Sequence, residues 1–210
     1  MSKRLVSALF TAALMGGLAG CAPPPAQLPK LKADDVILAF GDSLTHGTGA
    51  SRGQNYPAHL SALIGREVTA SGVPGEKSDG ALRRFAAELR RARPALVIVC
   101  TGGNDFLRKV DEEKTESNLR EIAAIARREN VPMILVAVPR ASLLSYLVPQ
   151  NHPMFARVAA DAGLWLEDES LKKVLSNPSM TSSDTIHPNE LGYLEMAKAL
   201  AALLRRAGAV

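Results

Sequence analysis

The sequence predicts one α/β domain with a parallel sheet that is covered by helices on both faces. Continuous apolar runs within 35–40, 95–100 and 131–138 are typical of strands buried on both sides. Amphipathic segments alternate with these runs, as in βαβ units. The chain has 210 residues, of which 47% are hydrophobic and 22% charged. This is enough for one well-buried core and too little for two large domains.

Five strands and their connecting helices can be placed in order along the chain. Pro57 suits the first turn of a helix, where its missing N–H costs nothing, and Thr115 is a suitable helix cap. An irregular segment follows the fourth strand. The expected elements are a strand at 35–40, a helix at 55–65, a strand at 67–71, a helix at 78–92, a strand at 95–100, a helix at 115–130, a strand at 131–138, a helix, a short strand at 163–167, a short helix and a last helix from about Asn189.

The first 20 residues have the features of a secretory signal. Lys3 and Arg4 precede the apolar segment LVSALFTAALMGGLAG, which is short for a membrane span and stops at Cys21. The junction LAGC (18–21) resembles the lipobox of bacterial lipoproteins. This resemblance implies that Cys21 is lipidated, whereas an ordinary signal with an incidental cysteine is the alternative. Residues 21–34 are then a Pro-rich tether and residues 35–210 the folded domain.

The lipoprotein resemblance also implies an exported protein that is anchored to the bacterial envelope by its lipid. Ala22, in place of an acid, implies outer-membrane sorting towards the periplasm if the host is Gram-negative. The chain has only two cysteines, so lipidation of Cys21 leaves Cys100 without a disulfide partner. We expect Cys100 to be a buried apolar residue, with a cysteine nucleophile as the alternative.

The charge of the chain gives no sign of a nucleic-acid partner. It has 25 basic and 21 acidic residues, and removal of Lys3 and Arg4 leaves 23 against 21, a net charge of +2. The arginine-rich stretches, among them Arg83 and Arg84, fall in predicted helices. We interpret them as solvated faces and as last turns that compensate the helix dipole.

Polar residues follow three predicted strands at the points where these strands end. They are the stretches GDS (41–43), GVPG (72–75) and GGND (102–105), and the carboxyl ends of parallel strands share one edge of the sheet, where ligands bind. A fourth stretch places Asp184 three residues before His187. A serine nucleophile needs a base such as histidine, and the histidine needs an acid to orient it. Glycine N–H groups and an asparagine amide are suitable oxyanion donors.

The stretches GDSLT, the loop with Gly75, GGND and DTIHP resemble the four ordered sequence blocks of the GDSL, or SGNH, hydrolases, over about residues 36–190. The resemblance implies a flavodoxin-like three-layer α/β/α fold and hydrolysis of acyl esters without a metal or other cofactor. It implies Ser43 as nucleophile, His187 as base and Asp184 as its orienting acid. The implied oxyanion hole comprises the Ser43 and Gly75 N–H groups and the Asn104 side chain. Asp42 would support the turn of Ser43.

Several residues compete for these roles. Gly72 is an alternative to Gly75, because Ser71 stands near the place of an asparagine that is common in the family. His46, His59 and His152 are less suitable bases than His187: His46 shares the serine's loop, His59 lies in a predicted helix, and His152 lacks an acid three residues earlier. The G-x-S-x-G, P-loop, HExxH and CxxC motifs are absent.

The close spacing of the blocks resembles the bacterial arylesterase, thioesterase and lysophospholipase branch. This implies a small acyl-ester substrate, and we expect a monomer. A carbohydrate O-acetylesterase and a non-catalytic envelope binding protein are the alternatives. The apolar segment with Leu143, Leu144, Tyr146, Leu147 and Val148 is expected to line an acyl pocket, with simple packing of a long connection as the other interpretation.

Overall fold

A computed structural model describes residues 25–140 and 150–210. Cys21 and the apolar segment at 143–148 therefore lie outside the described residues. Five parallel strands form one sheet in the order β2-β1-β3-β4-β5. This is the flavodoxin-like order that the family resemblance implies. The strands are β1 (Val36–Gly41), β2 (Glu67–Gly72), β3 (Leu96–Cys100), β4 (Met133–Val136) and β5 (Trp165–Glu167).

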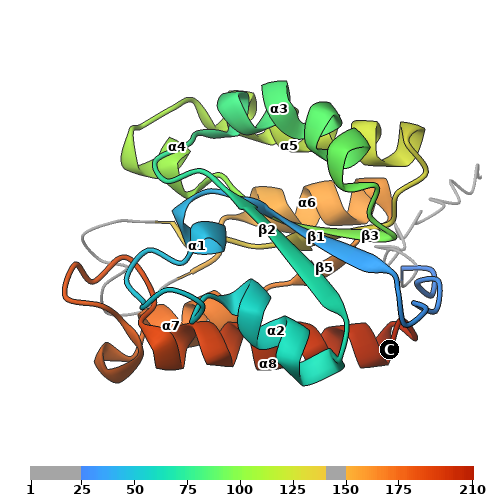
Figure 1. Ribbon diagram of the computed structural model, residues 1–210. Helices are drawn as coiled ribbons and strands as arrows, with labels where there is room; N and C mark the ends of the chain where they lie inside the picture. Colours follow the sequence, from blue (N-terminus) through green and yellow to red (C-terminus); the bar gives the residue numbers. More distant parts are fainter. Residues whose placement is uncertain (1–24, 141–149) are drawn as a thin grey trace, which may run out of the picture.

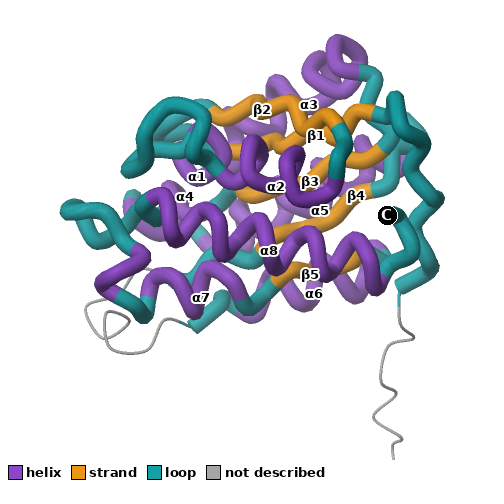
Figure 2. The backbone as a smooth tube through the Cα atoms, turned by 60° about the horizontal axis from the view of Figure 1, so that its bottom comes forward, coloured by secondary structure: helices purple, strands orange, loops and turns teal. Residues whose placement is uncertain are grey.

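Helices cover both faces of the sheet, as the continuous apolar strands require. In Figure 1, α3 (Ser78–Ala92) and α5 (Glu112–Arg128) lie above the sheet, and α2 (Tyr56–Ile64) and α8 (Glu190–Arg206) lie below it. Figure 2 brings α2 and α8 to the front, where they run over the same face. The helix α6 (Pro153–Ala162) packs beside α5, and α7 (Ser170–Leu175) beside α8. No helix among the described residues is both long and apolar enough to span a membrane.

Two very short helices stand where the sequence suggests only loops. They are α1 (Ser43–His46), directly after β1, and α4 (Gly103–Leu107), shortly after β3. A single helical turn of four or five residues leaves no periodic pattern, and Gly103 is a poor helix former. Both helices begin at the carboxyl edge of the sheet. They therefore place the GDS and GGND residues at the site. A 3-10 turn (Pro178–Met180) precedes the loop that leads to α8.

The prediction that Thr115 caps a helix is wrong. The helix α5 begins three residues earlier, and the Asp111 side chain is its cap, because its Oδ1 accepts a hydrogen bond from the Lys114 N–H at 3.1 Å. Aspartate caps helices as well as threonine does. Thr115 instead lies buried in the first turn, where its hydroxyl donates to the Asp111 carbonyl. The fourth strand is also shorter than the expected 131–138.

The beginning of the described chain packs against its end. The Leu28 and Leu31 N–H groups donate to the carbonyls of Ala207 and Ala209, each at 2.9 Å, and Leu31 is buried in the core. The Trp165 indole also donates to the Ala26 carbonyl at 2.9 Å. Much of the segment expected to be a tether is thus docked on the domain, because its leucines supply apolar surface to bury. In Figure 1 this contact lies at the opposite end of the sheet from α1.

Candidate active site

Ser43 stands where β1 passes into α1. Asp42 caps this helix: its Oδ1 accepts a hydrogen bond from the Leu44 N–H at 3.0 Å. Gly72, the last residue of β2, lies against α1 so closely that a Cβ there would come 2.2 Å from the His46 nitrogen. Glycine is therefore required at 72 for packing. This close approach fixes the turn that presents Ser43 to the carboxyl edge of the sheet.

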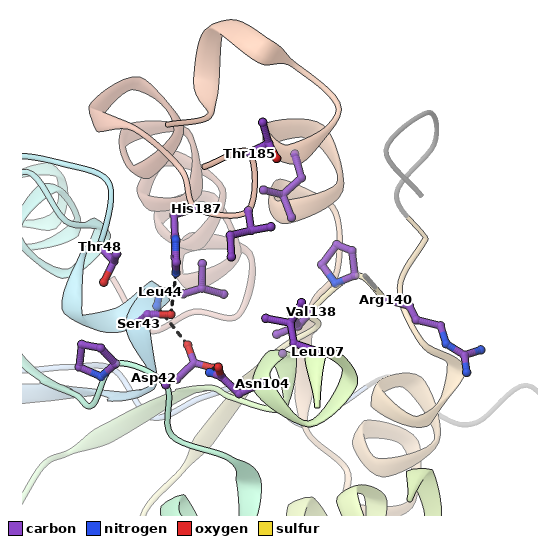
Figure 3. Close-up of a pocket in the computed structure, with 16 residues that line it drawn as sticks. Asp42, Ser43, Leu44, Thr48, Asn104, Leu107, Val138, Arg140, Thr185 and His187 are labelled. Carbon is purple, nitrogen blue, oxygen red and sulfur yellow. Dashed lines mark hydrogen bonds between the residues drawn. The ribbon is translucent and has the colours of Figure 1, made fainter. Parts of the chain in front are cut away.

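A continuous series of hydrogen bonds joins Ser43, His187 and Asp184. His187 Nε2 lies 2.9 Å from Ser43 Oγ (Figure 3). His187 Nδ1 lies 2.6 Å from Asp184 Oδ2. The Asp184 Oδ1 atom also accepts from the Ser182 hydroxyl and from the Ile186 and His187 N–H groups. This is the geometry in which an imidazole takes a serine proton while an acid holds its second nitrogen.

Asp184 is held in its ionised form by these donors. Partial burial opposes ionisation, but the hydrogen bonds from the His187 ring, the Ser182 hydroxyl and the two backbone N–H groups outweigh it. The pKa of the Asp184 carboxyl therefore lies well below its ordinary value. An ionised Asp184 accepts the proton of His187 Nδ1, which leaves Nε2 free to act as a base.

Asn104 and Gly75 lie with Ser43 along the same cavity. Asn104, in α4, donates from its Nδ2 to Asp42 Oδ2 at 3.3 Å, so that the second N–H of the amide is left for another acceptor. Gly75 has a φ of +75°, and no described residue accepts a hydrogen bond from its N–H. Both groups are thus suitable donors to an oxyanion that forms beside Ser43.

Asp42 lies below the nucleophile and differs from Asp184 in its surroundings. Its side chain is 1% exposed. Burial raises the pKa of Asp42 to about 6, although the hydrogen bonds from the Leu44 N–H and the Asn104 amide oppose this rise. The carboxylate joins β1 to α4. Its contacts agree with the expected role of supporting the turn of Ser43.

A buried polar cluster behind the site connects the two loops that carry Gly75 and Asn104. Asp105, next to Asn104, accepts hydrogen bonds from the Ser78 N–H at 2.8 Å and the Ser78 hydroxyl at 2.6 Å. The Ser78 hydroxyl also accepts from the Asn118 amide at 2.9 Å. These side chains are almost fully buried and are satisfied by one another. The network therefore ties the start of α3 to α4.

The cavity beside Ser43 has a volume of about 240 Å³ and is mostly apolar. Its apolar side chains come from α1, α4, α7 and the loops that follow β2, β4 and the 3-10 turn; they include Leu44, Pro74, Leu107, Val138, Leu175 and Ile186. Such a lining is suited to a hydrocarbon chain, because each buried methylene contributes about 0.8 kcal/mol. Among residues 25–140 and 150–210, no group of His, Cys, Asp and Glu side chains has the arrangement of a metal site.

The competing residues lie elsewhere or have other contacts. Gly75 lines the cavity, whereas Gly72 packs against α1. His152 caps α6 and its Nε2 lies 3.0 Å from Glu112 Oε2. Cys100 is fully buried, and burial raises the pKa of its thiol well above the ordinary value, which is unsuitable for a nucleophile.

The interpretation of Arg84 as part of a solvated face is wrong. Its side chain is only 20% exposed, and its guanidinium lies 4.0 Å from the centre of the Phe40 ring. Arg84 also forms an ion pair with Glu76, eight residues earlier across the start of α3, with 2.8 Å between its Nη2 and Glu76 Oε2. The pairing depends on the tertiary fold, and no helical spacing of four residues indicates it.

The comparisons with known proteins agree with the fold and with the family that the motifs resemble. A model of the GDSL-like lipase/acylhydrolase family matches residues 39–194. Esterase TesA of Pseudomonas aeruginosa is 30% identical over 170 residues, which are 77% of this chain and 83% of the relative. The thioesterase 1/protease 1/lysophospholipase L1 of Escherichia coli K12 is 27% identical over 168 residues, 75% of this chain and 77% of the relative.

Solved structures extend the likeness to three dimensions. The crystal structure of TesA has a TM-score of 0.71 and 26% identity to this chain, and the match covers 82% of this chain and 99% of that one. AlinE4, described as an SGNH-hydrolase family esterase, has a TM-score of 0.64 and 29% identity, with 85% and 98% covered.

Proposed function

The chain belongs to the GDSL-like lipase/acylhydrolase family, and on that premise we propose that it is a serine hydrolase of carboxylic acyl esters. The observation that carries this proposal is the hydrogen-bonded series from Ser43 through His187 to Asp184 beside an apolar cavity. The relatives named esterase, arylesterase and thioesterase/lysophospholipase support the same reaction class.

The reaction follows from the positions of these groups. Ser43 Oγ attacks the ester carbonyl while His187 Nε2 takes its proton, and the carbonyl oxygen becomes an oxyanion. The Ser43 and Gly75 N–H groups and the Asn104 amide donate to it. The carbon–oxygen bond of the leaving alcohol then breaks, and His187 returns the proton to that oxygen. Water repeats the sequence on the acyl-enzyme, releases the acid and restores Ser43.

The substrate that fits the cavity best has an acyl chain of several carbons. Long-chain alkyl esters, thioesters and lysophospholipids carry such a chain on the reactive carbonyl, and an aryl ester presents an apolar aromatic leaving group. A carbohydrate O-acetyl group would leave most of the apolar lining uncovered. The apolar lining therefore favours an acyl-lipid or aryl ester over the O-acetylesterase alternative. The reactive side chains also favour an enzyme over a binding protein.

The test is hydrolysis of p-nitrophenyl esters from acetate to palmitate by the full-length chain beside its Ser43→Ala variant. We expect kcat to fall on the order of 10⁶-fold in the variant, and Ser51→Ala, in an exposed loop, to match the unsubstituted protein. Hydrolysis that persists in Ser43→Ala would contradict the proposal. An optimum above four carbons supports an acyl-ester substrate, whereas activity on acetate alone supports the O-acetylesterase.

We further propose that the chain acts as a monomer on the bacterial envelope, with lipidated Cys21 as its anchor. The basic residues, apolar segment and LAGC junction of the first 21 residues support the anchor. Cys21→Ser should move the protein from the membrane fraction to the soluble fraction of the cell. An unsubstituted chain found in the soluble fraction would contradict the anchor.

A further inference from the structure

The oxyanion donor Gly75 lies in a turn whose type determines where its N–H points. The Glu76 N–H donates to the Val73 carbonyl at 3.1 Å, which closes a four-residue turn, 73–76. Pro74 stands second and Gly75 third with a φ of +75°, so the turn is type II. The central peptide of a type I turn has nearly the opposite direction, and the N–H of this peptide belongs to Gly75. The donor is therefore in place only while the turn keeps type II.

Arg84 holds this turn from the side of α3. Its Nε donates to Glu76 Oε2 at 2.8 Å, next to Gly75 in the chain. Its Nη1 donates to the Ser71 hydroxyl at 2.7 Å and its Nη2 to the Gly41 carbonyl at 2.8 Å, two residues before Ser43. One rigid, half-buried guanidinium thus joins the oxyanion turn to the end of the nucleophile's strand.

Arg108 holds the same turn from the opposite side. It follows α4 and stands four residues after Asn104, and its Nη1 donates to the Gly75 carbonyl at 2.5 Å. This carbonyl belongs to the peptide directly after the oxyanion donor. The contact fixes the position of the 75–76 peptide, on which the neighbouring 74–75 peptide pivots. The Gly75 donor is therefore tied to the element that carries the Asn104 donor.

We propose that Arg84 and Arg108 are positioning residues that hold the Gly75 N–H towards the oxyanion. The inference rests on the proposed function, since the oxyanion exists only in acyl transfer. Both residues act through the turn 73–76, and neither lines the cavity. Their loss should affect the transition state more than the bound substrate, because the donor is used only as negative charge develops.

The experiment compares Arg108→Ala, Arg84→Gln and Glu76→Ala in the full-length chain, with active sites counted by titration with a p-nitrophenyl phosphonate. We expect kcat per titrated site to fall about tenfold in Arg108→Ala and about 10²-fold in Arg84→Gln, with KM within twofold of the unsubstituted protein. Glu76→Ala should resemble Arg84→Gln if Arg84 acts through the turn. Arg108→Lys should recover most of the loss.

Two further readouts separate positioning from folding. The rate of phosphonylation should fall by the same factor as kcat/KM, because the phosphonyl oxygen occupies the oxyanion position. Arg83→Ala is the matched control, since Arg83 is exposed on α3 and its one ion pair among the described residues is with Asp79. If Arg84→Gln misfolds, fewer sites will be titrated and kcat per titrated site will not fall. The exposed Arg108 variants then test the positioning role alone.

Unchanged kcat per site in Arg108→Ala and Glu76→Ala would overturn the positioning role. Because Ser43-dependent hydrolysis by the unsubstituted protein is measured in parallel, that result would leave the esterase proposal standing. Absence of Ser43-dependent hydrolysis in the unsubstituted protein would overturn both.

Discussion

The two halves of the site are held in different ways. The nucleophile half, with Ser43, Gly75 and Asn104, is held by contacts between residues far apart in sequence: Asp42 and Asn104 are 62 residues apart, and Asp105 and Ser78 are 27 apart. The acid–base half is local. Asp184 bonds within the loop 182–187, and its side chain is 43% exposed.

The difference matches what each half has to do: the nucleophile half needs precise positions, whereas the acid–base half tolerates adjustment. The nucleophile half must hold three donors and a serine to within a fraction of an ångström, which buried networks do well. The acid–base half needs only the right tautomer and direction of one imidazole, and a short loop supplies both. The Ser43–His187 hydrogen bond joins the two halves at their reacting groups.

Among variants that keep Ser43, the largest effect is expected in the acid–base half. Asp184→Asn should lower kcat by about 10⁴-fold, because an amide cannot hold His187 in the tautomer that leaves Nε2 free. The buried nucleophile half should be undisturbed, so phosphonate binding without reaction should persist. The measurement is kcat for a p-nitrophenyl ester at saturating substrate. A loss below tenfold would show that the local loop does not control the base.

A smaller loss of activity is expected in the nucleophile half. Asn104→Ala removes one oxyanion donor and the partner of Asp42, and kcat should fall by roughly 10²–10³-fold with little change in KM. Asn118→Ala, in the polar cluster behind the site, is a useful comparison, because it removes a buried amide that does not face the cavity. A near-normal rate for Asn104→Ala would remove Asn104 from the oxyanion hole.

The smallest expected effect is a difference between the two halves in how their contribution to the free energy of unfolding depends on pH. Asp42 binds its proton more tightly in the folded than in the unfolded chain, with a pKa of about 6 against 3.8. Its contribution to the free energy of unfolding therefore falls as pH rises from about 4 to 6, by about 3 kcal/mol. Asp184 has the opposite sign. Folding lowers its pKa, so its contribution to the free energy of unfolding is lost as pH falls below the ordinary pKa of an aspartate.

Urea denaturation of the unsubstituted protein and Asp42→Asn between pH 4 and 7 tests this difference. The asparagine keeps an acceptor for the Leu44 N–H and cannot ionise. The variant should therefore gain stability relative to the unsubstituted protein as pH rises. A constant difference across this range would contradict the raised pKa of Asp42.

Most of the fold follows from the sequence, because strands buried on both faces and amphipathic helices leave strong periodic signals. All five strands were expected, and β1 and β3 lie within one residue of their expected bounds. The prediction of Thr115 as a helix cap is wrong because Asp111, four residues earlier, is an equally suitable cap. The helices α1 and α4 could not be predicted, because single turns are stabilised by tertiary contacts and leave no periodic pattern in the sequence.

The residues of the candidate site also fall into those that a local sequence pattern identifies and those that only tertiary contacts identify. Ser43, Gly75, Asn104, Asp184 and His187 could be predicted because each stands in a short motif. The structure brings Ser43, Gly75, Asn104 and His187 to one cavity, and Asp184 is hydrogen-bonded to His187 behind it. The contacts of Arg84 and Asp105 could not be predicted from the sequence. Their partners lie on other elements, and an arginine within a helix has the same local pattern whether it is solvated or bridges a turn and two strand ends.

The contact between residues 28–31 and 207–209 makes the domain a candidate for circular permutation. A short peptide could join Val210 to residue 25 without crossing the cavity, because both lie at the amino edge of the sheet (Figure 1). New ends could then open at the exposed turn around Gly53. The permuted chain would keep every residue of the site while its two ends move from the amino edge of the sheet to the turn around Gly53.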